Sequence, residues 1–250
     1  MQHNRPYVLT IAGFDPSAGA GLTADTKTFE QHKVYGLAIC SGITLQTEDT
    51  FIAMRWEKIP DVLQAVEVLL AKYPVKVIKT GILPNVDYLE QIISYVNLHF
   101  PLIKIIVDPV FKASAGFELF DFTSRDRFYK TLKKCYLITP NLEEVEWITG
   151  EETAEKAADE LAKHCAVFLK GGHSTTKKGV DYLYEGKQII EFLPAKESTN
   201  SKHGTGCVLS AAIASNLALG FSLEEACRRG KAYLEKVLES NQTLLGYHNV

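Results

Sequence analysis

Short apolar runs and longer amphipathic segments alternate along the whole chain. Runs rich in β-forming residues predict buried strands, and apolar residues at helical spacing predict helices. The predicted strands cover residues 7–13, 35–47, 51–59, 75–80, 103–107, 136–139 and 167–170, and a hairpin covers 179–184 and 188–193. The predicted helices cover 22–31, 60–73, 85–97, 125–134, 140–149, 152–164, 205–219 and 222–239. This order favours a three-layer α/β fold, with a mostly parallel central sheet, helices on both faces and an antiparallel hairpin at one edge.

Composition and charge narrow the class of protein. No linker, repeat or low-complexity segment divides residues 1–250, so we expect a single domain. The net charge of −3 supplies no basic field, and we expect neither a nucleic acid nor a membrane surface as partner. No stretch approaches the ~18 apolar residues of a membrane span, and the first apolar run continues into Asp15, unlike a signal peptide. Five scattered cysteines without a Cys-x-x-Cys pair argue against a disulfide framework and structural zinc, so we expect a cytoplasmic protein.

The segment 203–207 reads His-Gly-Thr-Gly-Cys and leads directly into the apolar helix predicted from residue 205. Glycines allow a tight turn and a close approach of the backbone to a ligand. The first N–H groups of a helix have no internal partners and favour an anion, such as a transferred phosphoryl group. Cys207 would lie near the same place. The alternative interpretation is an ordinary glycine turn before a core helix, with a buried, inert cysteine.

Polar residues and glycines follow several of the predicted strands. They are Asp15, Gln46, Gly81, Asp108, Asn141 and the sequence Lys-Gly-Gly-His at 170–173. In parallel sheets, ligands bind beyond the carboxyl ends of the strands, and this convergence therefore favours a ligand site that includes segment 203–207. The sequence contains neither a Gly-x-Gly-x-x-Gly motif nor a P-loop, which argues against a nucleotide-binding oxidoreductase of the dinucleotide class and against a P-loop enzyme.

Several of these residues also have structural explanations. Asn141 and Glu144 match a capping box at a helix start, as do Ser222 and Glu225. Asp25 alone resembles a solvated helix residue, and Asp108 and Lys170 alone are compatible with simple strand ends. His173 and His203 are expected in loop structure and are left out of the catalytic set, and Val62, Val66 and Leu69 form a stripe expected in the core.

Seven short motifs occur in order between residues 12 and 207: AGFDPSAGAGLTAD, TLQT, KTGIL, DPV, ITPNLEE, KGGH and HGTGC. With this ordered set the chain resembles the bacterial hydroxymethylpyrimidine/phosphomethylpyrimidine kinases of thiamine biosynthesis, in the ribokinase superfamily. The resemblance implies a ribokinase-like fold and transfer of a phosphoryl group from ATP, with Mg²⁺, to hydroxymethylpyrimidine or its monophosphate. A homodimer is one assembly that we expect, although the sequence carries no signal for it.

The resemblance also implies roles for individual residues. The pyrimidine would be surrounded by Gly13, Asp25, Gln46, Ile82 and Val110, with Asp25 and Gln46 hydrogen-bonded to its nitrogens and Ile82 in place of the family's usual methionine. Asp108 and Glu144 would help to hold Mg²⁺, and Asn141, Lys170 and Gly171 would lie at the nucleotide phosphates. Gly204, Thr205 and Gly206 would form the anion hole, with Cys207 beside the substrate hydroxymethyl group.

A helix N-terminus and nearby cations lower a thiol pKa, which would allow Cys207 to accept the hydroxyl proton as a thiolate near neutral pH. The sequence leaves the protonation state of Cys207 open, so this residue is either a base or a well-placed neighbour of the hydroxyl group. The closest alternative function is a pyridoxal or pyridoxine (vitamin B6) kinase, against which the amide of Gln46 favours an aminopyrimidine. A non-catalytic ligand-binding protein is the more remote alternative. Residues 46–55 and 111–117 are candidate lid segments, and Lys112, which departs from the family pattern, has no assigned role.

Overall fold

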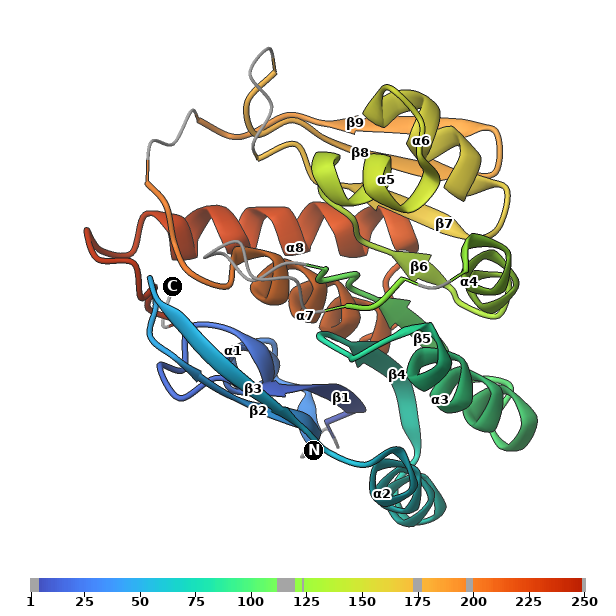
Figure 1. Ribbon diagram of the computed structural model, residues 1–250. Helices are drawn as coiled ribbons and strands as arrows, with labels where there is room; N and C mark the ends of the chain where they lie inside the picture. Colours follow the sequence, from blue (N-terminus) through green and yellow to red (C-terminus); the bar gives the residue numbers. More distant parts are fainter. Residues whose placement is uncertain (1–4, 112–119, 123, 173–176, 197–199, 249–250) are drawn as a thin grey trace.

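The computed structural model describes residues 5–111, 120–122, 124–172, 177–196 and 200–248. Within these residues, nine strands form one sheet in the order β3-β2-β1-β4-β5-β6-β7-β8-β9 (Figure 1). The strands are β1 (Tyr7–Phe14), β2 (Tyr35–Gln46), β3 (Phe51–Trp56), β4 (Val75–Thr80), β5 (Lys104–Val107), β6 (Leu137–Ile138), β7 (Ala166–Leu169), β8 (Asp181–Glu185) and β9 (Gln188–Phe192). The described helices are α1 (Gly21–Gln31), α2 (Ile59–Lys72), α3 (Val86–His99), α4 (Arg125–Leu132), α5 (Leu142–Thr149), α6 (Ala154–Ala162), α7 (Thr205–Ala218) and α8 (Leu223–Leu238).

The sheet is parallel from β2 through β1, β4, β5 and β6 to β7. The β8–β9 hairpin is antiparallel at one edge, as predicted. At the other edge β3 runs antiparallel to β2, which the strand pattern alone did not specify. The connection at 47–50 explains this orientation, because a parallel crossover needs a dozen or more residues and a short link allows only a hairpin.

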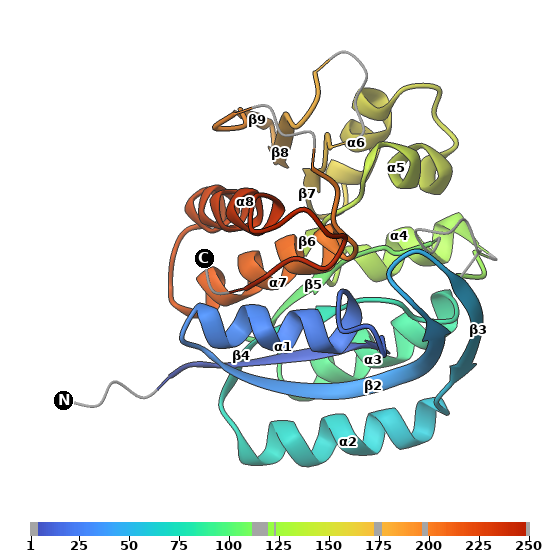
Figure 2. The same ribbon diagram turned by 90° about the vertical axis from the view of Figure 1, so that its left-hand side faces the viewer.

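Helices cover both faces of the sheet (Figure 2). The buried strand residues alternate between the two cores on these faces. Leu9 on β1 and Ile78 on β4 pack in the core beneath α2, α3, α4, α5 and α6. Their neighbours Val8 and Val77 point to the opposite face, which α1, α7 and α8 cover. Because both faces are buried, the strands read as continuous apolar runs. The predicted three-layer ribokinase-like fold is therefore confirmed.

Two local predictions can be compared with the helices. On α2, Val62 and Val66 are buried as expected, and Leu69 is partly buried against the same core. At the start of α8, the Ser222 side chain accepts a hydrogen bond from the Glu225 N–H, but the Glu225 carboxylate instead pairs with Arg229 at 2.7 Å. Only half of the predicted capping box is therefore present there. No described helix is both long and apolar enough to span a membrane.

Candidate active site

The polar residues predicted at the strand ends lie at one edge of the sheet, next to the start of α7. Asp108 follows β5, Asn141 follows β6 and Lys170 follows β7. The Lys170 ammonium lies 3.0 Å from an Asp108 carboxylate oxygen and 3.6 Å from a Glu144 carboxylate oxygen. Lys170 is thus not a simple surface strand end, since only 13% of its side chain is exposed.

The turn into α7 has the conformation that its glycines suggested. Gly204 is the N-cap residue and has φ of +76°, and a Cβ there would lie 2.1 Å from the carbonyl oxygen of Gly19. Only glycine satisfies both conditions. Gly204 has no side chain with which to cap the helix, so among the described residues the N-cap leaves the first N–H groups of α7 available to an anion.

Gly206 turns its backbone toward the charged groups of the site. A Cβ at this residue would lie 3.2 Å from the Lys170 Nζ and 3.8 Å from an Asp108 oxygen. The first turn of α7 and the Lys170 ammonium therefore face the same small space. A helix N-terminus, with about half a positive charge, and a lysine together favour a phosphate group.

Gly171, the second residue of the Lys-Gly-Gly sequence, is fixed by the neighbouring hairpin. Its N–H donates to Asp181 at 2.8 Å, and Asp181 is paired with Lys231 of α8 at 2.7 Å. A Cβ on Gly171 would lie 1.8 Å from the Val180 carbonyl oxygen. The contact excludes any larger residue and holds the backbone beside Lys170 in one position.

Asp108 is a buried carboxylate with three hydrogen-bond donors around it. It is 1% exposed and accepts hydrogen bonds from Thr139, Lys170 and Ser210, at 3.1, 3.0 and 2.9 Å respectively. Burial alone would raise the pKa of Asp108, but the charges of Lys170 and Lys79 outweigh it and lower the pKa. Asp108 is therefore an ionised counter-charge and not a simple strand end.

Asn141 and Glu144 form the predicted capping box. The Asn141 N–H donates to the Glu144 carboxylate at 2.7 Å, and the Glu144 N–H donates to the Asn141 side chain at 2.8 Å. Burial raises the pKa of Glu144 to about 7, because Lys170 only partly offsets burial and the nearby charge of Asp108 adds to the increase. The capping role and a position beside Lys170 therefore coexist.

The predicted Mg²⁺ ligands can be tested against this arrangement. The described part of the chain contains no group of three or more His, Cys, Asp or Glu side chains able to hold a metal ion. Mg²⁺ in kinases needs only one or two carboxylates, because phosphate oxygens and water complete its coordination. Asp108 and Glu144, on either side of Lys170, fit a Mg²⁺ that arrives with a nucleotide.

Asp25, which the resemblance assigned to the pyrimidine, forms a buried ion pair in this structure. Its side chain is completely buried, and the Lys79 ammonium of β4 donates to both of its oxygens at 2.8 Å. Thr10 donates to one of them at 2.6 Å. Asp25 is therefore no solvated helix residue, and its carboxylate has no exposed surface with which to touch a pyrimidine in this structure.

Sequence reasoning had not singled out Lys79. The signal was present, because a lysine inside the apolar strand 75–80 needs a buried counter-charge. Burial would lower the pKa of Lys79, but the charges of Asp25, Cys207 and Asp108 outweigh it and raise the pKa. The Asp25–Lys79 pair thus forms a buried ion pair without net charge, close to Cys207 in the first turn of α7.

Cys207 lies in the first turn of α7, close to this pair. Burial raises the pKa of its thiol to about 11, although Lys79 acts in the opposite direction. The structure therefore favours a neutral thiol over a thiolate near neutral pH, a choice that the sequence left open. The physical reason is that the cost of desolvating a thiolate exceeds the gain from the helix N-terminus and Lys79.

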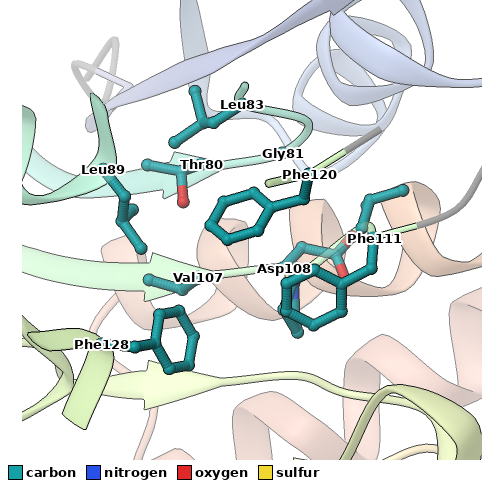
Figure 3. A pocket seen from close by; sticks show the side chains of 11 residues that line it. Thr80, Gly81, Leu83, Leu89, Val107, Asp108, Phe111, Phe120 and Phe128 are labelled. Atoms are coloured by element: carbon teal, nitrogen blue, oxygen red, sulfur yellow. The ribbon is translucent and has the colours of Figure 1, made fainter. Parts of the chain in front are cut away.

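The other residues predicted around the pyrimidine lie at or just after the ends of several strands, and their role as its binding site stays a prediction. The side chain of Ile82 packs on Gly13, where a Cβ would lie 2.3 Å from the Ile82 Cδ1. Gln46 is half-buried at the end of β2. Val110 borders a cavity of about 10 Å³ next to Asp108 (Figure 3). That cavity is otherwise mainly apolar, and it is lined by Thr80, Gly81, Leu83, Leu89, Val107, Pro109, Phe111, Phe120 and Phe128.

Asp15 and His203 form a pair that the sequence did not reveal, because 188 positions separate them. The His203 Nε2 lies 2.9 Å from an Asp15 oxygen, and Ser17 and Ala20 also donate to this carboxylate. Burial acts to raise the pKa of Asp15, but these hydrogen bonds outweigh it and lower the pKa to about 2. His173, Lys112 and most of the candidate lid 111–117 lie outside the described residues.

Comparisons with known proteins identify relatives of this chain. The family model for phosphomethylpyrimidine kinase matches residues 15–250. A hydroxymethylpyrimidine/phosphomethylpyrimidine kinase of Aquifex aeolicus is 33% identical, over 94% of this chain and 95% of its own.

Solved structures show the same likeness. Among them, a Staphylococcus aureus pyridoxal kinase in complex with pyridoxal has a TM-score of 0.83 and 27% identity, covering 95% of this chain and 89% of its own. The same kinase has also been solved with AMP-PCP. A Clostridium difficile phosphomethylpyrimidine kinase has a TM-score of 0.79 and 28% identity, covering 93% and 99%.

Proposed function

The chain belongs to the phosphomethylpyrimidine kinase family, and from this premise we propose that it phosphorylates 4-amino-5-hydroxymethyl-2-methylpyrimidine, its monophosphate, or both in turn. The phosphoryl donor in this proposal is ATP. The observation that carries the proposal is the uncapped N-terminus of α7, where Gly206 faces Lys170 and Asp108. A site for binding alone would not need this concentration of charge around a space fit for a phosphate.

The chain's own residues supply two elements of phosphoryl transfer. The first turn of α7, from Gly204 to Cys207, offers N–H groups to the transferred phosphoryl group, and Lys170 neutralises its charge. Phosphoryl transfer has a loose transition state, so orientation and charge neutralisation matter more than a strong base. A neutral Cys207 thiol is compatible with that requirement, because it can orient the substrate hydroxyl by a hydrogen bond.

Asp108 and Glu144 would hold Mg²⁺ at the nucleotide phosphates. When bound, Mg²⁺ neutralises phosphate charge and helps to orient the phosphoryl group. The backbone of Asn141 and Gly171 would border the phosphates, since each lies next to the Lys170 strand end.

The alcohol substrate would lie between Gly13, Ile82, Val110 and Gln46, with its hydroxymethyl group directed to the start of α7. In this arrangement Asp25 does not touch the substrate, and its role is to hold the Lys79 ammonium in place. The Gln46 amide can accept a hydrogen bond from an amino group and donate one to a ring nitrogen. A substrate that cannot form these hydrogen bonds leaves the Gln46 amide unpaired, which reduces the binding free energy by about 1–3 kcal/mol.

A pyridoxal kinase is the second candidate, because the Staphylococcus aureus pyridoxal kinase is structurally as similar as the phosphomethylpyrimidine kinase neighbour. Both substrates are nitrogen heterocycles with a hydroxymethyl group. Gln46 is the residue that discriminates between them in this proposal. A Gln46→Leu variant should lose activity toward the aminopyrimidine more than toward pyridoxal.

The test is ADP release with Mg-ATP and, separately, hydroxymethylpyrimidine, its monophosphate and pyridoxal. We expect the highest kcat/KM with one of the two pyrimidines. Turnover of pyridoxal alone would establish the second candidate. Absence of turnover with all three, together with intact ATP binding, would favour a ligand-binding protein without catalysis.

Assembly and location are further parts of the proposal. In this proposal two copies of the chain would form a homodimer through exposed apolar side chains at the β2–β3 edge of the sheet. Leu45 is 57% exposed there, and Ile52 is 63% exposed. Sedimentation of the purified protein checks this point. A cytoplasmic location remains the expectation from the cysteine usage.

A further inference from the structure

The chain after α8 folds back and lies beside the turn that leads into α7 (Figures 1 and 2). We call residues 240–248 the return segment. Its shape is set by Asn241, whose side chain accepts from the Thr243 N–H at 2.8 Å and donates to the Leu245 carbonyl at 2.8 Å. The Tyr247 N–H donates to the Ser240 side chain at 2.8 Å. These bonds make the return segment an ordered turn.

Lys202 anchors the return segment from the other side. Only 7% of this lysine is exposed, an unusual burial for a lysine. Its ammonium donates to the Asn241 carbonyl at 2.7 Å, to the Asn241 side chain at 3.1 Å and to the Thr243 carbonyl at 2.5 Å. All three donor positions of the ammonium are therefore used inside the protein, so Lys202 is not directed at a phosphate.

The return segment also contacts the two loops that frame the site. The His203 N–H donates to the Leu244 carbonyl at 2.8 Å. Leu245 and the His203 ring both lie against Gly19, where a Cβ would come within 2.8 and 2.6 Å of them. Gly19 in turn packs on Gly204, the N-cap of α7. The return segment thus lies behind the glycine turn and fixes it against the 15–20 loop.

We infer that the return segment positions the phosphate-binding turn of α7 and that Lys202 is the positioning residue that couples the two. This inference rests on the proposed function of the turn. Lys202 and Gly204 are two residues apart. Loss of the contacts between Lys202 and the return segment therefore displaces the first N–H groups of α7. Displacement of a catalytic group by about 1 Å can cost about 10²-fold in rate.

The test compares Lys202→Met with Lys196→Met as a matched control. Lys196 pairs with Glu239 on the surface at 2.9 Å, and 64% of its side chain is exposed. Lys202→Met should lower kcat about 10-fold to 100-fold, while KM for the alcohol substrate changes less than about 2-fold, because the hydrogen bonds of Lys202 hold Asn241 and Thr243 and not the residues proposed to bind the pyrimidine. Lys196→Met should leave both values unchanged.

Two further variants separate positioning from loss of fold. Lys202→Arg keeps a charged donor and should restore a large part of kcat, and Asn241→Ala should lower kcat as Lys202→Met does. The double variant Lys202→Met/Asn241→Ala should be no worse than the poorer single variant, since both remove the same contact. Thermal melting of each variant, with the assay run well below its midpoint, reports the folded fraction.

A kcat per folded molecule that equals the wild-type value in both Lys202→Met and Asn241→Ala would overturn the inference. Binding of AMP-PCP by calorimetry provides a readout that does not depend on turnover. If the wild-type protein turns over none of the proposed alcohols, the proposed function fails, while a roughly 10-fold weaker AMP-PCP affinity in Lys202→Met would still support positioning. Unchanged affinity in that case would reject it.

Discussion

The buried Asp25–Lys79 pair gives the most quantitative prediction. Asp25→Asn keeps the size of the side chain and the hydrogen bond from Thr10, but it leaves the Lys79 ammonium without its counter-charge. Both side chains are 0% exposed, so water cannot replace the lost partner. At 2.8 Å and an effective dielectric constant of about 20, the lost attraction is about 6 kcal/mol.

The net loss is smaller, because Lys79 can release its proton. Removing a proton at pH 7 from a lysine with an ordinary pKa of about 10.4 costs roughly 5 kcal/mol, which sets an upper limit. Removal of one partner from a buried pair typically costs about 3–5 kcal/mol. We therefore expect Asp25→Asn to lower the free energy of unfolding by about 3–5 kcal/mol, or the midpoint of melting by roughly 10 °C.

The pH dependence of this loss in unfolding free energy tests the same reasoning in a second way. In Asp25→Asn, burial without a counter-charge would hold the pKa of Lys79 below its value in the unfolded chain. The destabilisation is then larger at pH 7 and decreases as the pH rises toward the unfolded Lys79 pKa of about 10.4. At acidic pH the difference also decreases, because burial raises the pKa of Asp25 and the wild type loses this charge as well. Urea unfolding of the variant and the wild type should therefore give a smaller difference at pH 9.5 than at pH 7.

Replacing both Asp25 and Lys79 completes a double-mutant cycle for this pair. Asp25→Leu/Lys79→Met removes both charges and fills the space with apolar groups, so it should recover most of the stability but not the turnover. A stability change below about 1 kcal/mol in Asp25→Asn, equal at both pH values, would refute the reasoning. Such a result would instead support the direct contact between Asp25 and the substrate that the family resemblance implied.

Two shorter predictions concern other groups of the site. Asp15→Asn should lower the free energy of unfolding by about 2 kcal/mol, because the pKa of Asp15 falls from 3.8 to about 2 on folding. Urea unfolding of variant and wild type should show this difference in full above about pH 4. The difference should disappear as the pH falls through 2. Cys207→Ala should lower kcat about 10²-fold with little change in ATP affinity. Because the pKa of the Cys207 thiol is about 11, its alkylation by iodoacetamide, followed by mass spectrometry, should keep accelerating from pH 7 to pH 9. A plateau near pH 7 would instead indicate a thiolate.

The fold could be predicted from the sequence because its signals are local. Both faces of the sheet are buried, so the strands appear as apolar runs, and glycine, proline and capping residues mark most helix ends. The orientation of β3 was not specified by its own residues and follows from the short link at 47–50. The half-formed capping box at Ser222 shows a limit of such patterns, because the exposed Glu225 has arginine partners within reach.

The candidate site was predictable only in part. Topology alone brings Asp108 and Lys170 together, since both follow parallel strands. The pairing of Asp25 with Lys79 depends on which way the side chains point, and the partner of His203 lies far away in the chain. The sequence left the protonation state of Cys207 open, because desolvation depends on packing, which the sequence motif does not encode.

The central claim is that the phosphoryl group binds at the first turn of α7, opposite Lys170. A graded series at Gly206 tests it most directly, because a Cβ there would lie 3.2 Å from the Lys170 ammonium. ADP release with Mg-ATP and hydroxymethylpyrimidine should fall modestly in Gly206→Ala and by about 10²-fold or more in Gly206→Val, with both proteins still folded at the assay temperature. Wild-type turnover in a folded Gly206→Val protein would contradict the claim.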